Sequence, residues 1–168
     1  MKQRRLFATL LLAAIMALAI AGPASAAQLG GADQGGRQLT TTLTGAEEVP
    51  VPGNPDGIGF ATVTVNPGQG LVCYELSVSG IEAATAAHIH EAPVGVAGPV
   101  VEELLPPTDG SSSGCVEVDR AEAMDILKNP ADYYVNVHNA DFPGGALRGQ
   151  LSKSPGPYHK STVIGAGA

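Results

Sequence analysis

The sequence predicts an all-β fold: an antiparallel, Greek-key-like sandwich or flattened barrel of about eight strands with one short helix. Short runs rich in Val, Thr, Ile and Tyr recur along the chain, and clusters of Gly, Pro, Asn and Asp, such as residues 52–57 and 66–70, separate them. This rhythm is typical of antiparallel strands joined by turns. One stretch, residues 119–130, has the pattern of a helix instead.

The expected strands are short. We place them near residues 38–45, 58–65, 71–79, 85–91, 99–105, 114–118, 132–138 and 145–151. Successive residues of a strand point to opposite faces, so apolar residues two apart identify the core face. In the third strand this face carries Val72, Tyr74, Leu76 and Val78, and the outward face carries Cys73, Glu75 and Ser77.

The helix follows the sixth strand. Asp119 is a typical N-cap residue, and Glu122, three residues later, completes a capping box. Apolar residues continue from there until Pro130, which ends the pattern. We expect this helix to cover an open end of the barrel.

The two cysteines of the chain are Cys73 and Cys115. Alternation places both on outward faces, which is compatible with a disulfide if their strands are neighbours. The bridge would enclose 41 residues, and a loop of that size stabilises a fold by about 3 to 4 kcal/mol. The alternative is a thiol pair that binds metal or does redox chemistry, but the close Cys-x-x-Cys spacing is missing.

The N-terminus has the pattern of a signal peptide over residues 1–26. Lys2, Arg4 and Arg5 precede an apolar run over residues 6–21, and Ala24-Ser25-Ala26 supplies a cleavage site. A permanent anchor is the alternative, but the run is shorter than the roughly 20 residues that span a bilayer. We therefore expect a secreted or extracytoplasmic protein, with the cell envelope as one location, and no membrane span after cleavage.

After cleavage, 142 residues remain, enough for one domain. We expect this domain at residues 38–152, between flexible tails at 27–37 and 153–168, which are rich in Gly, Ala, Gln, Pro and Ser. Six basic and sixteen acidic residues remain, a net charge of about −10. Such a charge repels nucleic acid, so we expect no nucleic-acid partner.

Three histidines form the candidate site. His88 and His90 are two apart and project from one face, and Val135 and Val137 suit the core, which turns Tyr134, Asn136 and His138 outward. If the two strands are adjacent, three imidazoles converge as copper and zinc sites require. The alternative is that these histidines lie on the surface or fix loops. His159 falls in the predicted tail, so we exclude it as a ligand.

Other polar residues receive more limited roles. Glu91 is either an acceptor for an imidazole N–H or a solvated charge, and Arg148 ties two strand edges together by pairing with a carboxylate. The adjacent Glu47 and Glu48 point to opposite faces, so we expect a strand end rather than a carboxylate dyad. No catalytic triad or phosphate-binding loop is found, and we assign no catalytic residue.

Several ordered motifs resemble one known family. They are Leu43-Thr44-Gly45 with Glu48-Val49-Pro50, Ala87-His88-Ile89-His90, Gly98-Pro99-Val100-Val101, Tyr134-Val135-Asn136-Val137-His138, and residues 144–151. In this order they are similar to the CHRD domain, the module first described in chordin, and they cover about residues 39–151. The resemblance implies a secreted domain and, through chordin, an extracellular protein or matrix partner.

A more distant resemblance concerns the site. His88-Ile89-His90-Glu91 is similar to the His-x-His-Glu strand of copper/zinc superoxide dismutases, and Gly144-Gly145-Ala146-Leu147-Arg148 is similar to their late Gly-rich arginine motif. The resemblance implies copper at His88, His90 and His138, and an anion near Arg148. No histidine lies between His90 and His138, so the bridging ligand and the histidines of a zinc subsite are missing.

Three functions follow as hypotheses. The first is a metal-binding domain with copper favoured and zinc as the alternative, in which Glu91, Asn136 and Arg148 support the ligands or an anion. The second is a non-catalytic extracellular interaction module with an aromatic patch at Tyr133, Tyr134, Phe142 and Pro143. The third is a copper-only enzyme related to superoxide dismutase.

Overall fold

The computed structural model describes residues 35–154. The predicted signal peptide at 1–26 lies outside the described residues, as do most of the tails predicted at 27–37 and 153–168. The strands are β1 (Arg37–Thr44), β2 (Ile58–Asn66), β3 (Leu71–Ser79), β4 (Ala84–Glu91), β5 (Val100–Leu104), β6 (Ser111–Glu117), β7 (Tyr133–Asn139), β8 (Leu147–Gln150) and β9 (Ser152–Lys153). The helices are α1 (Arg120–Lys128) and the short 3-10 turns η2 (Gly45–Glu47) and η3 (Pro130–Asp132).

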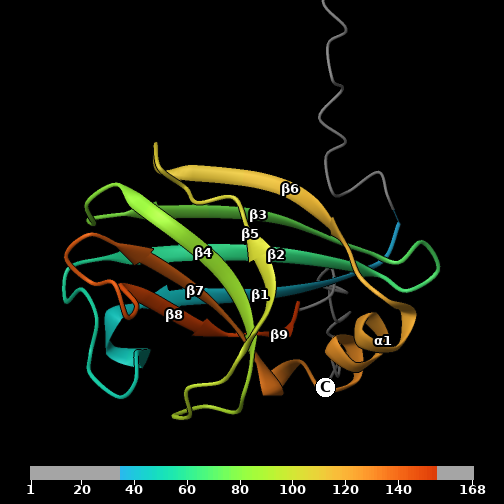
Figure 1. The fold of residues 1–168 in the computed structure, drawn as a ribbon. Coiled ribbons are helices and arrows are strands. Elements are labelled where there is room, and N and C mark those ends of the chain that lie inside the picture. Colours follow the sequence, from blue (N-terminus) through green and yellow to red (C-terminus); the bar gives the residue numbers. More distant parts are fainter. Residues whose placement is uncertain (1–34, 155–168) are drawn as a thin grey trace, which may run out of the picture.

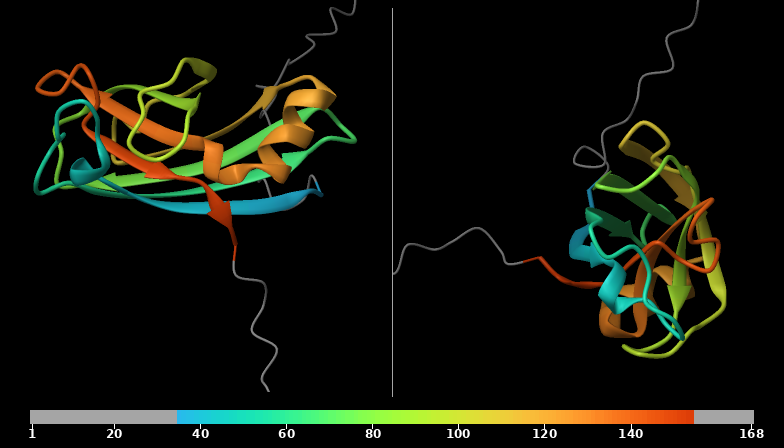
Figure 2. Two further views of the ribbon diagram at one scale, coloured as in Figure 1. Left: turned by 90° about the horizontal axis from the view of Figure 1, so that it is seen from below. Right: turned by 90° about the vertical axis from the view of Figure 1, so that its left-hand side faces the viewer.

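The strands form one antiparallel sheet that curls into a nearly closed barrel (Figures 1 and 2). Its order is β5-β4-β7-β8-β1-β2-β3-β6, and β9 pairs with β1. The two ends of this series, β5 and β6, come together beside Leu105, the residue that follows β5. Leu105 N–H donates to the Tyr74 hydroxyl of β3 at 2.7 Å, and the Ser112 hydroxyl of β6 donates to Leu105 O at 2.7 Å. The predicted all-β class with one α-helix is confirmed.

The core lies inside this barrel and has the composition that alternation predicts. Val63, Val72, Ile89, Val135 and Val137 are fully buried. Such branched apolar side chains fit a half-buried pleated surface and stabilise the fold by removing apolar area from water. Inward-facing strand positions therefore fix which side chains point outward.

Helix α1 lies at one end of the barrel (Figure 2). The Asp119 carboxylate accepts from Glu122 N–H at 2.9 Å and caps the first turn. Ala123 and Ile126 are fully buried, so this face of the helix extends the core. No helix among residues 35–154 is long and apolar enough to cross a membrane.

The two cysteines are joined. Cys73 of β3 lies directly opposite Cys115 of β6 in the antiparallel register, with 3.9 Å between the Cα atoms, and the two form a disulfide. The predicted bridge is confirmed. β6 begins at Ser111, three residues earlier than the predicted 114, because the hydroxyl-rich run 111–113 continues the ladder with β3.

Candidate metal centre

The candidate site lies on the outward face of two neighbouring strands, β4 and β7. His88 pairs with Asn136, His90 with Tyr134, and Ala86 with His138. Ile89 and Val137 are buried in the core between these positions, which directs the three imidazoles to the opposite face. The strand neighbourhood on which the predicted site depended is present.

The three imidazoles converge. One ring nitrogen from each of His88, His90 and His138 lies within 4.8 Å of the others. The closest pair is His88 Nδ1 and His138 Nε2, 3.1 Å apart. Metal–nitrogen bonds of 2.0–2.1 Å place two ligands of a tetrahedral ion about 3.3 Å apart. The 3.1 Å separation of the closest pair is near this value, and the third nitrogen lies within 4.8 Å of both.

Backbone carbonyls orient two of the rings. His90 Nδ1 lies 3.0 Å from Gly98 O, and His138 Nδ1 lies 3.0 Å from Pro143 O. A carbonyl only accepts, so each Nδ1 carries the proton and each Nε2 keeps its lone pair. His90 Nε2 is buried and has no hydrogen-bond partner among the described residues. A metal ion would satisfy that buried nitrogen, so the donor set fits copper or zinc.

The electrostatics favour neutral rings. Burial lowers the pKa of His88, and the neighbouring imidazoles of His138 and His90 lower it further. Burial also lowers the pKa of His90 and of His138, and each carbonyl bond opposes this in part. Neutral imidazole is the form that binds metals.

A stack of three side chains supports His90. Its ring lies parallel to the Tyr134 ring, with 4.7 Å between centroids and 7° between planes. The guanidinium of Arg148 lies 3.5 Å from the Tyr134 ring centroid. Because β7 lies between β4 and β8, His90 and Arg148 reach Tyr134 from opposite sides. The Tyr134 ring therefore packs against one face of the His90 ring and restricts its rotation.

The loop formed by residues 92–99 covers this stack. Arg148 donates to Val96 O at 2.9 Å and Pro93 O at 3.2 Å, and Gln150 donates to Ala92 O at 2.7 Å. Arg148 is only 2% exposed. The predicted carboxylate partner was therefore wrong: the guanidinium bonds to loop carbonyls, because the loop folds over the outer face and encloses it.

The family now follows from comparison. The family model of the CHRD domain matches residues 39–151. The chain belongs to the CHRD family. No curated protein and no solved structure matches the chain significantly.

Glu48 is a buried carboxyl group of this CHRD domain, although alternation predicts an ordinary strand end at this position. It is 4% exposed, and its Oε1 accepts from Asn136 Nδ2 at 2.8 Å. Desolvation raises its pKa from 4.5 to about 7, although the charge of Arg148 and the Asn136 bond oppose the shift. The one available signal was the position of Glu48 in the CHRD motif.

Two further carboxylates differ in their relation to the imidazoles. Glu103 of β5 pairs directly with His88 on the outward face, and its charge favours the protonated form of that ring. Glu91 pairs with Tyr133 at the strand end. Its negative charge contributes to the raised pKa values of Tyr133 and Glu122. The structure thus brings Glu103, not Glu91, beside the candidate ligands.

Proposed function

We propose that this CHRD domain is a secreted metal-binding module that holds one copper or zinc ion at His88, His90 and His138. The observation that carries the proposal is the convergence of three imidazole nitrogens within 4.8 Å. One of these nitrogens, His90 Nε2, is buried without a partner. CHRD membership and the disulfide support an extracellular location for the module.

Copper is the favoured ion. The donor set consists of imidazole alone, because both cysteines are held in the disulfide. Imidazole suits copper and zinc, and a given nitrogen site binds Cu²⁺ more tightly than Zn²⁺. The group of ligands found among residues 35–154 has three members, which leaves room at a bound ion for water or another small ligand.

Isothermal titration calorimetry tests the proposal. We expect one Cu²⁺ per chain at pH 7.5 in a buffer that does not chelate copper. His138→Gln removes one ligand and is expected to weaken binding by tenfold or more. His159→Gln is the matched control, because it removes the histidine of the chain that lies in the predicted C-terminal tail. Absence of binding at micromolar copper, or equal affinities of wild type and His138→Gln, would contradict the proposal.

Partner binding is the second candidate, because CHRD domains are extracellular interaction modules. The aromatic patch predicted for this role does not form: Tyr133 and Tyr134 are buried, and Phe142 packs against the core. The exposed apolar residues near the histidines are Val94, Val96 and Val100, on or beside the loop formed by residues 92–99. The test is capture of an extracellular partner by the wild type and by Val94→Asp. Capture by the wild type that persists when a chelator removes metal ions, together with loss of capture in Val94→Asp, supports this role.

A further inference from the structure

The outward face of β1, β2, β3 and β6 lies on a different part of the barrel from the histidines and differs from it in chemistry. Residues on this face form regular rows in the antiparallel register. One row consists of Thr42, Phe60, Ser77 and Ser111. Ser and Thr are the commonest residues at the other outward positions, and the outward positions of these four strands carry no Lys or Arg.

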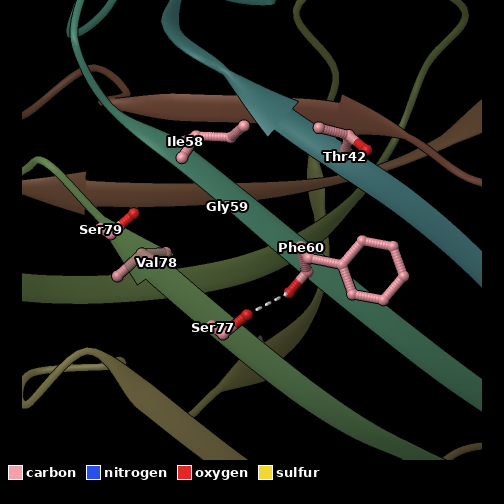
Figure 3. Close-up of a pocket in the computed structure, with 7 residues that line it drawn as sticks. All are labelled: Thr42, Ile58, Gly59, Phe60, Ser77, Val78 and Ser79. Atoms are coloured by element: carbon pink, nitrogen blue, oxygen red, sulfur yellow. Dashed lines mark hydrogen bonds between the residues drawn. The ribbon is translucent and has the colours of Figure 1, made fainter.

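Phe60 is the aromatic residue at the outward positions of these four strands. Its side chain is 48% exposed, and that of Ile58, two residues earlier on the same strand, is 53% exposed. In Figure 3 these two side chains follow β2, with Thr42 on one side and Ser77 and Ser79 on the other. A second shallow groove, which includes Thr62 and Glu75, adjoins the first at Phe60.

From this arrangement we propose that the face is a binding site for a neutral polysaccharide, with Phe60 as the stacking platform. A pyranose ring has an apolar C–H face and a rim of hydroxyl groups. The exposed phenyl ring matches the apolar face. The surrounding Ser and Thr hydroxyls both donate and accept hydrogen bonds, as the sugar rim requires. The two grooves on either side of Phe60 extend this pattern beyond a single sugar unit.

The charge of the face excludes other polymers. It carries Glu75 and no basic side chain beside the grooves, in a chain with a formal net charge of −7. An acidic glycan or a nucleic acid would be repelled. A second copy of the chain is also disfavoured, because Ile58 and Phe60 are the large exposed apolar side chains of this face, whereas interfaces between identical chains are more apolar than the rest of the surface.

Titration with neutral oligosaccharides tests the proposal. The probes are cellohexaose, xylohexaose, maltohexaose and the chitin hexamer, and the readout is the amide spectrum of the ¹⁵N-labelled protein. We expect at least one probe to shift the amide signals of β2 and β3 selectively. Phe60→Ala is expected to weaken that binding tenfold or more, and Phe60→Tyr, which keeps the ring, to retain it.

Val94→Ala is the matched control, because it removes an exposed apolar side chain from the loop beside the histidines. It should bind the probe like the wild type. The proposal is overturned if none of the four probes binds, if Phe60→Ala binds as tightly as wild type, or if heparin shifts the same signals more strongly. A concentration-dependent dimer that Phe60→Ala abolishes would also overturn it and assign the face to self-association.

Discussion

Each imidazole of the candidate centre has a different neighbour, and these neighbours decide which nitrogen is free. Gly98 O and Pro143 O each face a Nδ1 atom, so His90 and His138 offer Nε2. His88 turns its Nδ1 toward His138 instead. Alternation predicts that all three histidines face outward, and the pairing of β4 with β7 in the structure brings them together. The carbonyls could not be predicted, because they belong to loops without a periodic pattern.

The pH dependence of copper affinity follows from the lowered pKa values of the three imidazoles. Because burial lowers each pKa below the ordinary histidine value, binding at pH 7 releases fewer protons than it would from three ordinary histidines. We expect the affinity to stay level between pH 8 and pH 7 and to fall only below the ordinary histidine pKa of about 6.5. Calorimetry in two buffers of different ionisation enthalpy measures the protons released. Release of about one proton or more at pH 7 would contradict this prediction.

Glu48 makes stability depend on pH. Its pKa rises from 4.5 to about 7 on folding, so between these values the folded state holds a proton that the unfolded chain has released. The free energy of unfolding therefore falls as the pH rises through this range, by on the order of 3 kcal/mol. We expect Glu48→Gln to remove this loss and to be more stable than wild type at pH 8. Urea unfolding at pH 5 and pH 8 measures the effect.

The control for this substitution is Glu47→Gln, which changes the adjacent exposed carboxylate. It should keep the wild-type pH dependence. If Glu48→Gln loses as much stability between pH 5 and pH 8 as wild type does, the carboxyl of Glu48 is not the titrating group.

Among the elements, the strands agree with the sequence more closely than the loops do. β2, β3 and β4 each match the predicted strand to within one residue at either end, because their alternating apolar residues enter one core. The loop formed by residues 92–99 has no such pattern. Its position depends on Arg148, Gln150 and Tyr134, which lie far along the chain. On the outer face of β7, Tyr134 and Asn136 are consequently buried where alternation predicts exposure.

Arg148 holds that loop in place. Arg148→Met keeps much of the side-chain length but removes the bonds to Val96 O and Pro93 O. We expect faster amide hydrogen exchange over residues 92–99, and weaker copper binding because Gly98 O, which orients His90, belongs to this loop. Arg120→Met is the control, since Arg120 bonds to Pro67 O on an exposed part of the chain. Unchanged exchange over residues 92–99 would contradict the role of Arg148.

The whole molecule depends on contacts between strands that are distant in the sequence. β4 pairs with β7, and β3 with β6, so that neither the histidine site nor the disulfide lies between consecutive strands. Periodicity assigns each residue to a face but does not identify neighbouring strands. The motifs of the CHRD family, in contrast, span most of the barrel, so that together they identify the family of the whole domain.

The disulfide stabilises the barrel near its open seam, where β6 is a terminal strand of the sheet. Replacing both Cys73 and Cys115 by Ala frees a loop of sequence separation 42. We expect the free energy of unfolding to fall by about 3 to 4 kcal/mol. Urea unfolding with and without reductant measures it. Reductant should destabilise wild type to a similar extent and leave the double variant unchanged. Equal stability of wild type and the double variant without reductant would contradict the prediction.

The central claim is that three particular imidazoles bind one ion, and pulsed electron paramagnetic resonance of the one-to-one Cu²⁺ complex tests it most directly. This measurement detects the remote nitrogen of each coordinated imidazole. We predict the signature of three imidazoles in the wild type, two in His138→Gln and three in His159→Gln. A wild-type spectrum with fewer than three imidazoles, or one that changes only in His159→Gln, would contradict the account.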